Sequence, residues 1–134
     1  MIWGFYEIIK NLCDGRVYAS RAPQNAQPPF VVFQETSSER WRDINAPAGM
    51  AQDTIQLDVY SDNNFQAKEI ALQAEILLDG FRGVVFFGDD SPQSFVDFRG
   101  ISRQNGGATL DQTDEPFLYR YFADYRVTYK TENE

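Results

Sequence analysis

The residues of this chain that could do chemistry are mainly carboxylates. Two groups of them stand in turn-like segments, Asp89-Asp90 and the cluster of Asp111, Asp114 and Glu115. Hard cations such as Ca²⁺ and Mg²⁺ prefer such oxygen ligands. Neither group has the spacing of an EF-hand, and acidic residues beside Gly or Pro usually serve solvation and Asx turns. We therefore expect neither a metal site nor a cofactor.

Other chemistry has little support in the sequence. The chain contains no histidine, so the commonest general base and metal ligand is missing. Its single cysteine, Cys13, lies in an apolar stretch without a His or Lys partner, which favours a small buried hydrophobe over a nucleophile. The glycine-rich places at residues 83–88 and 105–107 precede no Lys-Ser/Thr helix start of the kind that phosphate-cradling loops need.

One short segment combines cations with an aromatic ring, in the order Arg40, Trp41, Arg42. Such residues can stack a base and meet phosphates, and they are also enriched in protein interfaces. The formal net charge of −8 should repel nucleic acid. We therefore predict that these three residues contact a partner protein, and we place Asp111, Asp114 and Glu115 in the same class of candidate interface residues.

The composition allows one ordinary hydrophobic core. Hydrophobic residues make up 43% of the 134 residues and aromatic residues 15%, which is enough to fill a core and argues against intrinsic disorder. We expect a single domain over residues 1–134. The first residues lack the features of a signal peptide, and no stretch approaches the ~20 apolar residues of a membrane span. The expected setting is a bacterial cytoplasm.

The elements that must position these residues follow from hydrophobic periodicity. Residues 2–13 have the one-sided apolar stripe of a helix that stops at Asp14-Gly15. Residues 30–34 are β-branched and aromatic and predict a strand that begins after Pro28-Pro29. Residues 37–52 predict a long hairpin arm or loop. Residues 54–60 alternate, with Ile55, Leu57 and Val59 on the buried face.

The second half predicts a helix and three strands. Residues 67–78 have helical spacing, with Asn63 and Gln66 as a capping box and Gly80 at the C′ position. Residues 84–87 and 95–98 predict strands, and residues 103–116 a flexible acidic loop. In the last strand, alternate residues from Tyr119 to Tyr129 form a tyrosine-rich face that we assign to the core. The predicted fold is α+β, a mostly antiparallel sheet in the order α-β-β-α-β-β-β with both helices on one face.

The joint order of several short motifs resembles one protein family. These motifs are Pro29-Phe30-Val31-Val32-Phe33-Gln34, Gln56-Leu57-Asp58-Val59-Tyr60-Ser61-Asp62, Ala67-Lys68, Leu77-Leu78-Asp79-Gly80-Phe81 and Leu118-Tyr119-Arg120-Tyr121-Phe122-Ala123-Asp124-Tyr125-Arg126-Val127. With the N-terminal helix, they resemble the tail completion, tail terminator and tail-to-head joining proteins of long-tailed phages over nearly the whole chain. Each motif alone is common, so their order and spacing carry the resemblance.

The resemblance implies a structural virion protein without catalytic residues. Such a subunit forms a ring, usually hexameric, that caps the tail tube, stops its polymerisation and docks onto the head connector. The implied partners are other copies of the chain, the tail tube protein and the connector or stopper protein, with DNA passing through the ring without specific binding and with no membrane involved. An acidic subunit suits that passage, because cationic walls would hold the phosphates.

Two alternatives stay open at the level of sequence. The first is another phage neck protein, such as a head-completion stopper. The second belongs to a different class and is a small-molecule-binding or carboxylate-dependent enzyme domain that uses Asp58, Asp97 or Asp124.

Overall fold

The computed structural model describes residues 1–40, 49–88, 93–111 and 118–130. These residues form two α-helices, one 3₁₀ helix and one six-stranded sheet. In chain order the elements are α1 (Ile2–Ile9), the 3₁₀ helix (Leu12–Gly15), β1 (Val17–Ala19), β2 (Phe30–Arg40), β3 (Met50–Ser61), α2 (Asn64–Leu78), β4 (Gly83–Phe87), β5 (Ser94–Asp111) and β6 (Leu118–Lys130). The α+β class and the order of the predicted elements are confirmed.

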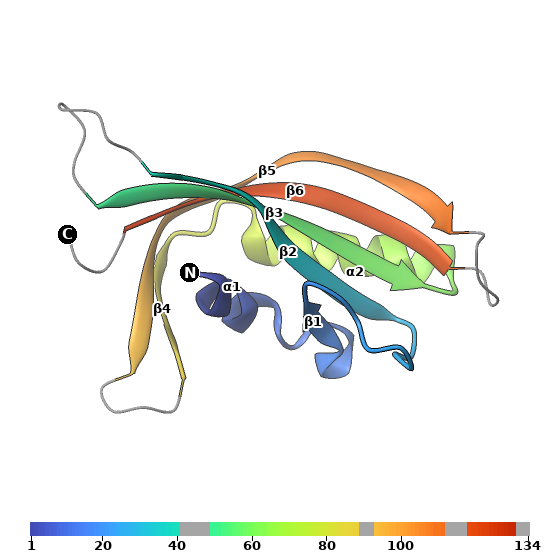
Figure 1. Cartoon of the computed structure of the whole chain (residues 1–134). Helices are drawn as coiled ribbons and strands as arrows, with labels where there is room; N and C mark the ends of the chain where they lie inside the picture. Colours follow the sequence, from blue (N-terminus) through green and yellow to red (C-terminus); the bar gives the residue numbers. More distant parts are fainter. Residues whose placement is uncertain (41–48, 89–92, 112–117, 131–134) are drawn as a thin grey trace.

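The sheet is built around three long antiparallel strands. Its spatial order is β1-β2-β3-β6-β5-β4, so the C-terminal strand β6 lies in the interior between β3 and β5 (Figure 1). β3 and β6 pair without interruption from Met50 opposite Lys130 to Ser61 opposite Tyr119. The short edge strand β1 pairs with β2 in parallel, and it was not predicted. Every other pairing is antiparallel, as expected.

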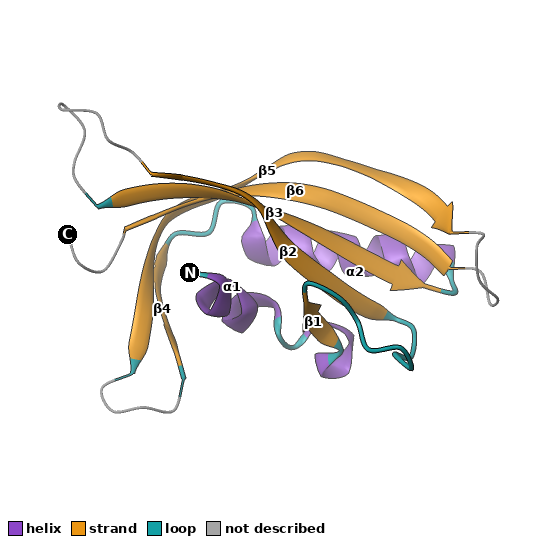
Figure 2. Cartoon of the chain, viewed as in Figure 1, coloured by secondary structure: helices purple, strands orange, loops and turns teal. Residues whose placement is uncertain are grey.

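The core lies on one face of the sheet, and both helices cover that face (Figure 2). Alternation along β3 buries Ile55, Leu57 and Val59 there, as predicted. The tyrosine-rich face of β6 points the same way: Tyr125 and Tyr129 are buried, and Tyr119 and Tyr121 pack against the core. The sheet therefore has one covered face and one face without helices.

Helix α2 begins and ends where its sequence predicts. Asn63 is the N-cap, and its side-chain oxygen accepts hydrogen bonds from the backbone N–H groups of Phe65 at 2.9 Å and Gln66 at 3.2 Å. The predicted capping box is modified, because the Gln66 side chain accepts from the Ser61 hydroxyl at 2.8 Å. Gly80 has a φ of +84°, the left-handed conformation expected just beyond the helix.

Helix α1 is shorter than the predicted element at residues 2–13. The α-helix ends at Ile9, and a 3₁₀ turn carries the chain on to Gly15, so the predicted stop at Asp14-Gly15 is where the helical segment finishes. The fully buried Phe5 packs its ring 5.9 Å from that of Phe33 on β2. This contact lies at the centre of the packing of α1 on the sheet.

The segment 103–116 was predicted as a loop, and this prediction is wrong for its first nine residues. β5 continues to Asp111 and pairs with β6 along its length, from Asp97 opposite Lys130 to Asp111 opposite Leu118. Pairing with a strong neighbouring strand overrides the weak strand propensity of the glycines. Gly107 gives the Phe122 ring room to lie against the backbone, because a Cβ atom at this position would lie 3.0 Å from the ring.

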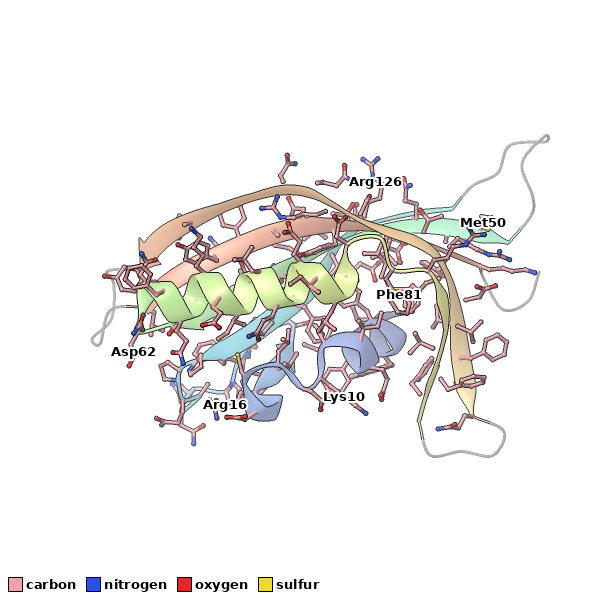
Figure 3. The ribbon with its side chains drawn as sticks, turned by 180° about the vertical axis from the view of Figure 1, so that it is seen from behind. Lys10, Arg16, Met50, Asp62, Phe81 and Arg126 are labelled. Carbon is pink, nitrogen blue, oxygen red and sulfur yellow. The ribbon has the colours of Figure 1, made fainter. Side chains whose placement is uncertain are left out.

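Residues 37–40 and 50–52 are paired strand residues at the base of a hairpin, one of the two forms predicted for this segment, and residues 41–48 lie outside the described ranges. β2 extends to Arg40 and β3 begins at Met50, and the paired residues include Arg40 opposite Ala51. The β4–β5 hairpin bends away from the other strands of the sheet at a steep angle (Figure 1). It starts just beyond Phe81, which ends the connection from α2 (Figure 3).

We predict that Phe5→Ala lowers the free energy of unfolding by about 3–5 kcal/mol, because it deletes a fully buried aromatic ring and leaves a cavity between α1 and β2. Chemical denaturation followed by circular dichroism measures this change. The matched control is Trp3→Ala on the same helix, where the side chain is exposed, and its effect should stay below about 1 kcal/mol. Equal losses in the two variants would contradict the packing described.

Candidate assembly surfaces

The predicted interface residues fall at two hairpin ends. Arg40 is the last residue of β2, and Asp111 is the last residue of β5. The other four, Trp41, Arg42, Asp114 and Glu115, lie outside the described residues, as does the Asp89-Asp90 pair. The two hairpins end at opposite ends of the sheet, since Met50 pairs with Lys130 and Asp111 with Leu118 at the two ends of β6. The interface role of these residues stays a prediction.

Of the three carboxylates proposed for an enzyme, Asp124 stands opposite Gln56 and near Asp58, whereas Asp97 lies far from both. Asp58 pairs with Arg120 at 2.7 Å, and Asp97 pairs with Arg99 at 3.2 Å. Asp58 stands opposite Phe122 and Asp97 opposite Lys130, so eight positions of β6 separate them. Within the described ranges no group of three or more His, Cys, Asp or Glu side chains is arranged to hold a metal ion. None of the helices described here has the length and apolar character needed to cross a membrane.

Asp58 is a structural carboxylate on the sheet face that carries no helix. It is only 5% exposed, and burial raises its pKa, while the Arg120 guanidinium opposes that rise. Arg120 donates from Nε at 2.9 Å and also lies 4.8 Å from the centre of the Phe122 ring. Gln56 contributes a further hydrogen bond at 3.4 Å. This cluster joins β3 to β6 across the centre of the sheet.

A second buried carboxylate, Asp53, lies on the covered face. The Tyr129 hydroxyl donates to its Oδ2 atom at 2.8 Å and ties the end of β6 to β3. The other oxygen, Oδ1, has no hydrogen-bond partner among the described residues. One buried carboxylate bonded to one tyrosine is not a reaction centre. We therefore assign Asp53 a structural role, in which it holds β6 against β3.

The structure shows an apolar groove that the sequence did not predict. It lies between α2 and the ends of β5 and β6, and its volume is about 290 Å³. Its lining is mostly apolar and consists of Leu57, Lys68, Ala71, Leu72, Glu75, Arg103, Gly106, Gly107, Ala108, Tyr121, Phe122, Ala123 and Tyr125. Burial in this region raises the pKa of Tyr125 to about 12, so its hydroxyl is not an acid or base at neutral pH.

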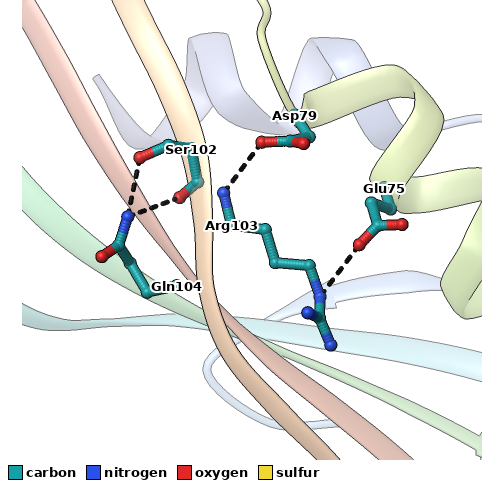
Figure 4. Close-up of polar contacts among 5 residues, drawn as sticks. All are labelled: Glu75, Asp79, Ser102, Arg103 and Gln104. Carbon is teal, nitrogen blue, oxygen red and sulfur yellow. Dashed lines mark hydrogen bonds and ion pairs between the residues drawn. The ribbon is translucent and has the colours of Figure 1, made fainter.

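Arg103 closes one end of this groove and attaches α2 to β5 (Figure 4). Its Nε atom lies 3.1 Å from a carboxylate oxygen of Glu75, and its backbone N–H donates to Asp79 at 3.0 Å. The backbones join here too, because Gly80 N–H donates to the Ile101 carbonyl at 2.7 Å. These bonds occupy the outer edge of β5 at residues 101–103. Beyond them, no described strand pairs with that edge.

The β4–β5 hairpin presents the second unexpected surface. One of its faces packs toward α1 through Val85 and Phe87, whereas Val84, Phe86 and Phe95 on the other face are exposed. Phe86 and Phe95 contact each other, with ring centres 5.9 Å apart. The uninterrupted apolar run of residues 84–87 was the available sign of such a surface, since a strand with one solvated face normally alternates.

Cys13 behaves as the sequence predicts. It is half-buried, and burial raises the pKa of its thiol to about 11. A thiol with such a pKa is almost entirely protonated at neutral pH, which excludes the activated nucleophile considered above.

Comparison with known proteins fits this picture of a protein whose surfaces, rather than a reaction centre, stand out. The chain matches the model of the family described as tail completion protein gp17 over residues 8–130. A chain in the solved structure titled "Virion of native gene transfer agent (GTA) particle" has a similar fold, with a TM-score of 0.60, 14% sequence identity and coverage of 94% of this chain and 91% of that chain. No curated protein shows significant sequence similarity.

The family match thus places the chain among the structural subunits of virions. The chain belongs to the tail completion protein gp17 family, which confirms the resemblance stated above, and it is a structural protein of a phage tail. The likeness to the gene transfer agent chain, at its low identity, shows the shared fold.

We predict that Arg120→Met raises the pKa of Asp58 further, because the cation that opposes the effect of burial is lost. When the pKa of a carboxyl group is raised by folding, the protonated group does not destabilise the fold at pH values below its unfolded pKa of 3.8. This stability is lost as the pH rises through the pKa of the folded state. The variant should therefore lose about 2 kcal/mol at neutral pH and much less near pH 3.5. Urea denaturation at both pH values measures this difference, with the exposed Arg126→Met as the control. A loss independent of pH would contradict the pairing.

We also predict that the Cys13 thiol reacts with a disulfide reagent about 10-fold more slowly in the folded protein than in urea, because the rise of its pKa from 9.0 to about 11 lowers the thiolate fraction more than it raises the nucleophilicity of the thiolate. The absorbance of the released thiolate follows the reaction. Equal rates in the two states would show a solvated, ordinary thiol.

Proposed function

We propose that this chain forms a closed ring, hexameric as the sequence resemblance implies, at the head-proximal end of the tail. The ring ends the growth of the tail tube and joins the tail to the head connector. The observation that carries this proposal is the family match over residues 8–130, which makes the chain a tail completion protein. The partners are other copies of the chain, the tube protein and a connector or stopper protein.

The shape of the molecule supports this role. A subunit inside a ring contacts neighbours on two sides and also meets the structures above and below, so it needs several separate surfaces. Three hairpins extend from the sheet in different directions, β2–β3, β4–β5 and β5–β6 (Figure 1). In this proposal the hairpin ends that carry Arg40, Trp41 and Arg42, and Asp111, Asp114 and Glu115, contact partner proteins.

The charge of the chain also suits the proposal. DNA must move through the ring during ejection, and a net charge of −8 per subunit gives the phosphates no strong general attraction. The subunit acts through its shape and contacts and needs no catalytic group. The buried carboxylates Asp58 and Asp53 each bond a partner within the sheet, which favours this view over the carboxylate-dependent enzyme.

We predict a specific morphology when the gene is deleted from its parent genome. Without a terminator, tubes polymerise past their normal end, so negative-stain microscopy of lysates should show tails of uncontrolled length that are not joined to heads. Supplying the wild-type chain in trans should restore joined tails of uniform length. Tails of normal length beside heads that have lost their DNA would instead assign the chain to the head-completion stopper.

A further inference from the structure

Two apolar surfaces of the described part of this chain are left uncovered. One is the groove between α2 and the ends of β5 and β6. The other is the outer face of the β4–β5 hairpin, formed by Val84, Phe86 and Phe95, of which Phe86 is 57% exposed. The first is a groove lined by residues of α2, β5 and β6, and the second lies on a hairpin that projects from the body of the molecule (Figures 1 and 3). Exposed apolar patches of this kind mark interaction sites.

A single copy cannot bring these two surfaces together. Both include parts of β5, but Phe95 and Ala108 are thirteen positions apart on this strand, or roughly 40 Å at the rise of an extended chain. The hairpin also bends away from the sheet, and its inner face is held against α1. The apolar hairpin of one copy can therefore reach only the groove of another copy.

The groove has the character of a protein contact. Its lining offers few polar groups, and the Arg103 guanidinium among them is already paired with Glu75. A small-molecule site would combine an apolar cavity with several converging polar groups, usually in a larger volume of about 300–1,000 Å³. Beside the groove, the outer edge of β5 beyond Arg103 lacks a strand partner among the described residues, and such an edge favours contact with another chain.

Charge favours a second copy at this place even though the chain as a whole is acidic. Copies with a net charge of −8 repel each other, so they meet best where the local charge is not negative. The charged groove residues are Lys68 and Arg103 against Glu75, a formal balance of +1. On the described part of the hairpin, Asp97 is paired with Arg99.

We propose that the outer face of the β4–β5 hairpin of one copy packs into the α2–β5–β6 groove of the next copy, with Phe86 and Phe95 against Leu72 and the small residues of β5. Because the two surfaces differ, the contact is heterologous, and its repetition closes a ring when the rotation between copies allows it. This inference rests on the proposed ring and identifies the contact that builds it.

The test uses two variants of the full chain that each disable one surface. Phe86→Glu places a charge on the exposed hairpin face, and Leu72→Glu places one at the 49% exposed wall of the groove. Both positions are solvated in the single copy, so circular dichroism should show an unchanged fold. Sedimentation at concentrations where the wild type is a ring should give each variant as a monomer. The matched control is Ile76→Glu, which lies one turn further along α2, is 81% exposed and does not line the groove; it should form the wild-type ring.

Mixing the two disabled variants is the decisive step. The Phe86→Glu chain keeps an intact groove, and the Leu72→Glu chain keeps an intact hairpin, so one productive contact remains between them. The mixture should form a dimer with one copy of each variant and nothing larger. A mixture that stays monomeric, rings formed by either variant alone, an Ile76→Glu chain that fails equally, or a monomeric wild type would each overturn the inference. The proposed terminator role is decided separately, by the deletion morphology, and it can survive the loss of this contact.

Discussion

The structure depends on one constraint, the pairing of β3 with β6 as two long strands that each have a single apolar face. Their twelve-residue register directs every second side chain toward the helices and every other one away from them. A slip of one position would turn Leu57, Val59 and Tyr125 out of the core. Helix α2 packs directly on both of these strands, and the β2–β3 and β5–β6 hairpins each contain one of them.

The same constraint leaves the molecule with surfaces that it cannot cover alone. Two helices shield only one face of the sheet, and the outer face of the β4–β5 hairpin is covered by neither of them. The chain has apolar side chains at these places where an isolated protein would normally place polar ones. A monomer with such surfaces is best understood as a component of an assembly, in agreement with its family.

The charged groups of the described core are used for structure. Arg120 and Asp58 connect the two central strands, Arg103 attaches the end of α2 to β5, and Tyr129 holds Asp53 at the base of the arm. Such bonds fix relative positions, and a tail subunit needs its surfaces held at fixed angles to meet the other proteins of the virion. These bonds therefore keep the sheet rigid while its hairpins stay exposed.

Local patterns in the sequence determined the elements that a short stretch of chain can specify. The alternation of β3 and β6, the Asn63 cap and Gly80 end of α2, and the inert character of Cys13 depend on neighbouring residues, and each was predicted. The order of motifs along the chain was enough to indicate the family. Tertiary structure alone decided the long strand β5, the parallel β1, the groove and the exposed hairpin face. Residues 103–111 are a strand because β6 supplies their hydrogen bonds, and the groove lies between elements of which α2 and β5 are joined by the bonds of Arg103 to Glu75 and Asp79. Both depend on contacts between residues distant in sequence, and no local period records such contacts.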